Sequence, residues 1–247
     1  MDASIREPWN DFLAEVTKAR SELGNPEVVW YRGHSNADWT LVPTLFRIPS
    51  GINGVELERR AFLEFKRTAS RLFERRHTDW EILFDMQHYW VPTRLLDWSE
   101  VLGVAVAFIL HSTYGRANDS ALYVLDPLKL NRLSGINEVK SIPDDALFDY
   151  RSIYWEKKPF AAQHPIAVIP PMQTERVFAQ RGVFTVHGDD PRHLEEQCPD
   201  VVKRIILRNE AKAAAREFLE YANLDEYSIY PDIVGMSRHL SRKIFGF

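Results

Sequence analysis

Cysteine is nearly absent from this 247-residue chain, in which Cys198 is the only thiol. A single cysteine excludes a disulfide within the chain and any cluster of thiolate metal ligands. The eight histidines include no His-x-x-x-His pair, so standard zinc spacings have no support and we expect no metal. The lone thiol favours a reducing compartment, and we predict a cytoplasmic protein.

Long hydrophobic runs and an export signal are missing as well. The longest strongly apolar segment, residues 101–110, is far shorter than the roughly 20 residues that span a bilayer. It is therefore predicted to be a buried helix, and no membrane is expected as a partner. Residues 1–16 mix Asp, Glu and Arg with apolar residues and lack the apolar core of a secretory signal.

Neither sign of charge dominates, because 31 Lys and Arg stand against 35 Asp and Glu. A chain-wide attraction to nucleic acid or anionic lipid is therefore not expected. One helical stretch is locally basic, but glutamates interrupt it, so we interpret it as a solvated helix face. Its basic residues are Arg59, Arg60, Lys66, Arg67, Arg71, Arg75 and Arg76.

Several common motifs do not occur in the sequence. It has no G-x-G-x-x-G after a strand, no Walker A motif and no G-x-S-x-G elbow, so Rossmann, P-loop and esterase-like sites lack support. It also has no internal repeat, low-complexity tract or Gly/Ser linker. The length suits one large domain, and we predict a single domain over residues 1–247.

The apolar periodicity predicts a mixture of helices and strands. A capping box formed by Thr78 and Glu81 predicts the start of one helix, which ends before Pro92. Helices are predicted over 12–23, 57–73, 79–91, 101–110 and 210–222, with a last one whose first turn holds Pro231. Strands are predicted over 28–31, 94–98, 121–125, 166–169, 183–186 and 201–207. These elements do not alternate regularly, which favours an α+β fold with a mixed sheet and flanking helices.

The first of two unusual clusters is Trp30-Tyr31-Arg32-Gly33-His34. An arginine at the exit of an apolar strand can pack its stem and form a salt bridge at the surface. Alternatively, its guanidinium is a fork that binds a phosphate or carboxylate, with Gly33 letting the ligand approach the backbone.

The second cluster, residues 86–99, packs amide, imidazole, guanidinium, carboxylate and hydroxyl groups between aromatic residues. Such density predicts a lined pocket, although each group also has a structural interpretation as a helix cap or an internal ion pair. The candidate residues are Gln87, His88, Arg94, Asp97 and Ser99.

Two geometric expectations follow from these clusters. Arg94 and Asp97 should pair with each other, because a guanidinium and a carboxylate three residues apart can face one pocket. Gln87 and His88 should lie close to Arg32, because a ligand site needs both clusters to converge.

Together the clusters resemble the signatures of the FRG-domain family, an aromatic-Arg-Gly motif and Gln-His-x-x-x-Pro-Thr-Arg-Leu-Leu-Asp-Trp-Ser/Thr. Segments 176–184 and 230–235 are similar to the family as well, so the resemblance spans most of the chain. Trp90 and Tyr230 depart from the common pattern, and we expect them to alter pocket volume rather than chemistry. The family is defined mainly by sequence and has no agreed activity.

The Tyr-Arg-Gly motif also resembles the first motif of the Arg-Ser-Glu class of ADP-ribosyltransferases. That resemblance implies a fold like theirs and NAD as cofactor, with Arg32 gripping the NAD phosphates. Ser99 is the nearest match to their serine motif. No Glu-x-Glu or Gln-x-Glu occurs at a late strand; Gln180 is the closest candidate, and it lacks the negative charge that stabilises an oxocarbenium-like transition state.

Three functions are compatible with these features. The first is an NAD-using enzyme, either ADP-ribosyltransferase-like or NAD-hydrolysing, and the second is a non-catalytic module that binds a nucleotide, a phosphate or a protein partner in a sensor or defence system. The third, a nucleic-acid effector, is disfavoured by the net charge. In the enzyme hypothesis His88, Asp97 and Gln180 are catalytic, and Arg32, Gln87, Arg94 and Ser99 bind the cofactor.

Overall fold

A computed structural model describes residues 3–48, 53–69, 72, 78–111, 118–142, 149–171 and 174–246, with side chains described from residue 6 onward. Arg71, Phe73, Arg75 and Arg76, which belong to the predicted 57–73 helix and the basic stretch, lie outside these ranges. No helix in the described ranges has the length and apolar character that a membrane span requires.

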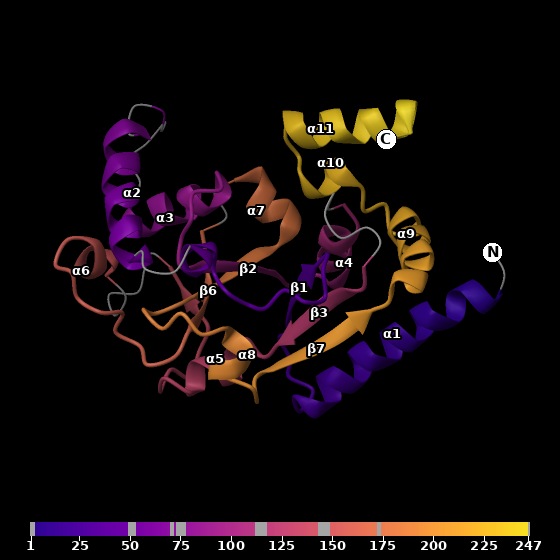
Figure 1. The fold of residues 1–247 in the computed structure, drawn as a ribbon, viewed down its shortest axis with the longest axis horizontal. Coiled ribbons are helices and arrows are strands. Elements are labelled where there is room, and N and C mark those ends of the chain that lie inside the picture. Colours follow the sequence, from indigo (N-terminus) through magenta and orange to yellow (C-terminus); the bar gives the residue numbers. More distant parts are fainter. Residues whose placement is uncertain are drawn as a thin grey trace.

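A seven-stranded sheet in the order β4-β5-β6-β2-β1-β3-β7 forms the centre of the molecule (Figure 1). Only β4 and β5 are parallel, and the other neighbouring strands are antiparallel. The sheet is therefore mixed, and the α+β prediction is confirmed. The strands are β1 Trp30–His34, β2 Leu95–Ser99, β3 Ser120–Leu125, β4 Lys140–Ser141, β5 Ile166–Ile169, β6 Gly182–Val186 and β7 Val202–Leu207.

Helices flank the sheet and bury its apolar residues in three clusters. One cluster joins α1, α4 and α9 to β1, β3 and β7, and a second joins α2, α3 and α6 to β2, β5 and β6. The third lies against the opposite face of the sheet. The helices are α1 Ala3–Glu22, α2 Gly54–Ala69, α3 Asp79–His88, α4 Leu102–His111, α5 Pro127–Arg132, α6 Tyr150–Tyr154, α7 Glu175–Gln180, α8 Leu194–Gln197, α9 Lys212–Tyr221, α10 Glu226–Ile229 and α11 Ile233–Leu240, with short helical turns η1 Thr44–Arg47, η4 Asn209–Ala211 and η5 Ser241–Phe245.

Local sequence signals account for several of these boundaries. The Thr78 side chain accepts a hydrogen bond from the Glu81 amide, and the Glu81 side chain accepts one from the Thr78 amide, which confirms the predicted capping box at the start of α3. The apolar run after Val101 forms α4, whose residues from Gly103 to Ala107 are buried. The predicted buried helix is therefore confirmed.

The structure corrects several predicted boundaries, among them the start of α1 at Ala3, the end of α3 at His88, and the bounds of β1 and of the last helix. β1 does not end before Arg32, because Gly33 and His34 continue the ladder opposite Leu122 and Ala121 of β3. Arg32 thus lies inside a central strand instead of at its exit. The last helix begins after Asp232, whose carboxylate accepts hydrogen bonds from two backbone amides, so Pro231 precedes the helix instead of occupying its first turn.

Candidate functional site

The centre of the sheet contains a seam between β1 and β2. β1 pairs with β3 along its whole length, but it pairs with β2 only where Tyr31 lies opposite Ser99. Farther along the seam, a side-chain hydrogen bond joins the two strands in place of a backbone one. Nη1 of Arg32 donates to the carbonyl oxygen of Asp97 at 2.5 Å. The strands therefore separate where both sequence clusters meet.

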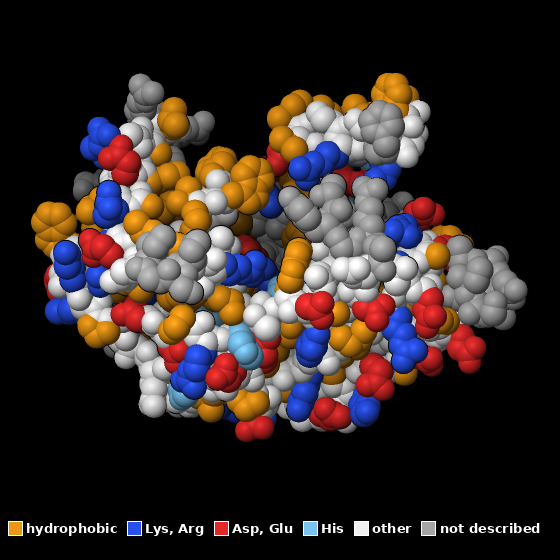
Figure 2. Space-filling view, viewed as in Figure 1, with side chains coloured by type: hydrophobic (Ala, Val, Ile, Leu, Met, Phe, Trp, Pro, Cys, Tyr) orange, Lys and Arg blue, Asp and Glu red, His pale blue; other side chains and the backbone are white. Residues whose placement is uncertain are grey.

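A cavity of about 390 Å³ opens at this seam, a volume typical of small-molecule sites. Its walls come from β1, β2, β6, α3, α4, α7 and the turn after α3, and Figure 2 shows the surface hollowed between the α3–α7 region and the C-terminal helices. The expected convergence of Gln87 and His88 with Arg32 is confirmed. The lining residues are Tyr31, Arg32, Gly33, Thr44, Phe84, Gln87, His88, Trp90, Val91, Asp97, Trp98, Phe108, Arg176, Val177, Gln180, Gly182 and Phe184.

Arg32 is held in place from two sides. Besides the Asp97 carbonyl, its guanidinium lies 3.6 Å from the Asp97 carboxylate, and its Nε donates to Nε2 of His34 at 3.0 Å. Burial lowers the pKa of Arg32, but an arginine starts so far above neutrality that it stays charged. The fork is thus fixed and cationic at the cavity wall.

His34 serves this arrangement as a neutral acceptor. Its Nδ1 lies 3.2 Å from the Trp39 carbonyl oxygen, so Nδ1 carries the proton and Nε2 is free to accept from Arg32. Burial and the Arg32 charge lower the pKa of His34 to about 3. His34 is therefore neutral near pH 7, and Arg32 supplies the positive charge that faces the cavity.

The amide of Gln87 orients the carboxylate of Asp97. Nε2 of Gln87 donates to Oδ2 of Asp97 at 2.8 Å, and the hydroxyl of Thr93 donates to Oε1 of Gln87 at 2.5 Å. A chain of hydrogen bonds thus runs from Thr93 through Gln87 and Asp97 to Arg32. Because each group fixes the next, the polar wall is preorganised.

His88 and Gln180 complete the predicted residues that line the cavity. Burial, followed by the Arg176 charge, lowers the pKa of His88, so its imidazole is neutral near pH 7 and can accept a proton. The side-chain amide of Gln180 donates to the carbonyl oxygen of Ile229 at 3.1 Å, which ties α7 to α10.

The predicted pairing of Arg94 with Asp97 is wrong. Arg94 is fully buried, and its Nε donates to Glu58 at 2.7 Å, while a second contact joins Nη1 to Asp189 at 3.3 Å. In extended backbone, residues three positions apart point to opposite sides, so one pocket cannot receive both side chains. A buried guanidinium also requires a buried counter-charge, which Glu58 supplies.

Arg94 and Ser99 do not line the cavity, unlike the other candidates. The hydroxyl of Ser99 donates to the Gln180 carbonyl oxygen at 2.7 Å and accepts from the Val101 amide at 3.0 Å. It therefore links β2 to α7 and fixes the chain just before α4.

Gly33 lines the cavity and also has a packing role that the sequence did not predict. A Cβ atom built on Gly33 would lie 2.0 Å from the Ala105 carbonyl oxygen, so the glycine allows α4 to pack against β1. The group that approaches the Gly33 backbone closely in this structure is helix α4. Sequence reasoning also missed several cavity residues, of which Arg176 had the clearest signal, because it begins the family-like segment 176–184.

Comparison with known proteins agrees with the two signatures. The model of the FRG domain matches residues 27–117, a segment that contains β1, α2, α3, β2 and α4. No match was found among the curated proteins or the solved structures. In the described ranges, no group of three or more His, Cys, Asp and Glu side chains is placed to hold a metal ion.

Proposed function

We propose that this protein, with its FRG domain over residues 27–117, binds a nucleotide-like anion in the seam cavity, with Arg32 as the phosphate anchor. The preorganised guanidinium of Arg32 carries this proposal. His34 and Asp97 hold Nε and Nη1, and within the described ranges no hydrogen bond engages Nη2. A planar fork fixed before binding suits bidentate phosphate recognition and limits the entropy lost on association.

The remaining walls suit the other parts of a nucleotide. Phe84, Trp90 and Phe108 offer apolar faces to a base, and the Asp97 carboxylate and Gln87 amide can contact ribose hydroxyls. The resemblance of the Tyr-Arg-Gly motif to ADP-ribosyltransferases makes NAD or a relative our preferred ligand. A cytoplasmic location belongs to the same proposal, because a chain with a single cysteine has no internal disulfide and suits a reducing compartment.

A second candidate, NAD hydrolysis or ADP-ribosyl transfer, is favoured by a carboxylate and an imidazole that line the same cavity. Asp97 can stabilise a positively charged oxocarbenium-like transition state, and neutral His88 can accept the proton of the attacking water or acceptor. Gln180 can orient the substrate only by hydrogen bonding. Incubation with NAD and chromatography for nicotinamide separates the candidates, because release supports catalysis and binding without release supports a non-catalytic module.

Substitution of Arg32 by Lys tests the anchor, because lysine keeps the charge and loses the planar fork. We expect calorimetry to show that affinity for NAD, ADP-ribose or ATP falls about ten- to a hundredfold, as for a lost charge-assisted hydrogen bond of about 1.5 to 3 kcal/mol.

Arg208→Lys is the matched control, since the Arg208 side chain is 73% exposed and lies outside the cavity. The anchor role is refuted if none of the three nucleotides binds the wild type, or if Arg32→Lys and Arg208→Lys bind them equally.

A further inference from the structure

A second arginine, Arg176 of α7, lines the same cavity as Arg32. Its guanidinium lies over two aromatic rings, 4.7 Å from the centre of Tyr230 and 5.9 Å from that of Trp90. In the described part of the chain, no carboxylate forms an ion pair with it. Arg176 also hydrogen-bonds through its side chain to Tyr230. A guanidinium has five N–H donors and the ring faces occupy none of those in its plane, so further donors of Arg176 are available to an anion.

The local sequence around Tyr230 fixes this ring beneath Arg176. Asp232 caps α11 by accepting hydrogen bonds from the Val234 and Gly235 amides. A Cβ atom on Gly235 would lie 1.8 Å from the Tyr230 carbonyl oxygen, so only glycine lets α11 begin this close to Tyr230. The ring of Phe108 meets Tyr230 edge-on at 6.0 Å. Segment 230–235 thus builds a support for Arg176 from outside the FRG match.

Trp90 stands on the rim of the cavity with 74% of its surface exposed. Its φ of 62° lies in the left-handed region, which a bulky side chain seldom adopts. An exposed indole in a costly backbone conformation beside a cavity suggests a role in binding, because strain of this kind concentrates at ligand sites.

The cavity therefore has guanidinium groups on different walls and an exposed indole at its rim. Arg32 comes from β1 and is partly neutralised by Asp97, whereas Arg176 comes from α7 and faces aromatic rings. A single phosphate accepts hydrogen bonds from one of these two guanidinium groups. A ligand with two linked phosphates can satisfy both, and a base attached to them can stack on Trp90.

We infer that the ligand is a nucleoside diphosphate or a compound that contains one: Arg32 and Arg176 bind its two phosphate groups, and Trp90 stacks on its base. This inference rests on the proposed nucleotide site and narrows its ligand class. It assigns Arg176 and Trp90 distinguishable roles, since the arginine recognises charge and the tryptophan recognises the ring.

Calorimetry with ADP and with inorganic pyrophosphate tests these roles. We expect Arg176→Gln to weaken the binding of both compounds about tenfold or more, as a lost charge-assisted hydrogen bond would. Trp90→Ala should weaken ADP about tenfold and leave pyrophosphate unchanged, because only ADP carries a base. Trp90→Phe, which keeps an aromatic face, should restore most of the ADP affinity.

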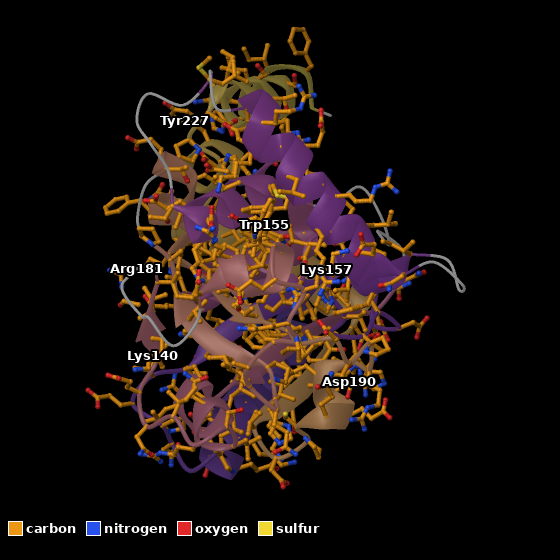
Figure 3. All side chains as sticks on the ribbon, turned by 90° about the vertical axis from the view of Figure 1, so that its left-hand side faces the viewer. Lys140, Trp155, Lys157, Arg181, Asp190 and Tyr227 are labelled. Carbon is orange, nitrogen blue, oxygen red and sulfur yellow. The ribbon has the colours of Figure 1, made fainter. Side chains whose placement is uncertain are left out.

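Arg208→Gln and Trp155→Ala are matched controls. Trp155 is 63% exposed at the end of α6, is labelled in Figure 3, and does not line the cavity. Circular dichroism and thermal melting of each variant verify that it is folded, which is expected because Trp90 is a surface residue and Arg176 is only partly buried.

The outcomes separate this inference from the proposed function. If the wild type binds NAD or ADP in an Arg32-dependent way, but Arg176→Gln and Trp90→Ala behave like their controls, the diphosphate inference is overturned and the nucleotide site stands. Equal loss of ADP and pyrophosphate in Trp90→Ala overturns the stacking role. Failure of every nucleotide to bind the wild type overturns both proposals.

Discussion

Trp90 occupies a position that usually belongs to glycine. The Trp90 amide donates to the Gln87 carbonyl oxygen, and the Val91 amide donates to that of Met86, which is the Schellman pattern at the end of α3. This pattern places the residue with positive φ immediately after the helix cap. The left-handed backbone conformation of Trp90 costs free energy, because its side chain crowds the backbone there. Since the indole is largely exposed, its removal would sacrifice little packing.

Trp90→Gly is therefore expected to stabilise the fold. We expect the free energy of unfolding to rise by about 1 kcal/mol, because glycine removes the left-handed strain and loses part of that gain to backbone entropy. Urea denaturation of both proteins measures the difference. Tyr89→Gly is the control, since Tyr89 is also exposed but has a φ of −96°, and it should not stabilise. A less stable Trp90→Gly protein would contradict the strain argument.

The sequence predicted which polar residues line the cavity better than it predicted which residues pair with them. The Gln87 to Asp97 cluster was recognisable because its polar groups are dense, and its convergence with Arg32 followed from the need for one site. The partner of Arg94 was not predictable, since Glu58 lies 36 positions earlier, in α2. Local spacing cannot reveal which distant carboxylate is buried beside an arginine.

At the scale of elements, the packing of α4 on β1 depends on the absence of a side chain at Gly33. The helix and the strand approach so closely that the Ala105 carbonyl oxygen and Cγ1 of Ile109 would lie 2.0 and 2.7 Å from an added Cβ. Arg32 and Gly33, which are neighbours in one motif, therefore have different roles. The arginine serves the cavity and the glycine admits the helix that helps to form its wall.

Gly33→Ala should destabilise the protein by about 2 kcal/mol, because overpacking must displace helix backbone. Gly188→Ala is the control, because its Cβ would meet nothing closer than 3.8 Å and its effect should stay within about 0.5 kcal/mol. Chemical denaturation of the two variants provides the comparison. Equal stability of the two variants would mean that α4 is not held against β1 as described.

The order of the longer elements was largely predictable, whereas the short helices α5, α6, α7, α8 and α10 and the pairing of strands were not. Apolar runs located the six longer strands because each is buried, while the two-residue β4 has too few residues to produce a pattern. The seam between β1 and β2 depends on which strands are neighbours. Nothing in either strand alone encodes that choice, so the position of the cavity required the structure.

At the scale of the whole molecule, two buried neutral histidines make stability depend on pH. Burial, with a smaller effect from Arg94, lowers the pKa of His187 to about 3, and burial and Arg32 do the same for His34. Both histidines have an ordinary pKa of about 6.5 when unfolded. The unfolded chain therefore binds more protons between about pH 6.5 and 3, and stability falls as the pH decreases through this window.

Each histidine should contribute a slope of up to about 1.4 kcal/mol per pH unit well below pH 6.5. We expect urea unfolding between pH 7 and pH 4.5 to show this loss, and His187→Gln to reduce its slope by about that amount. His193→Gln, which changes a half-buried histidine at the surface, is the control. An unchanged slope in His187→Gln would show that His187 does not titrate in this way.

The seam divides the sheet into two parts, β4-β5-β6-β2 and β1-β3-β7. Between them the ladder holds at Tyr31 and Ser99, and the Arg32 side chain adds one further link. A molecule bound at the seam would contact strands of both parts, and its contacts would hold the two parts together for as long as it stays bound. Occupancy of the cavity would then control how firmly the two halves of the protein are joined, so that the ligand becomes a structural component of the sheet.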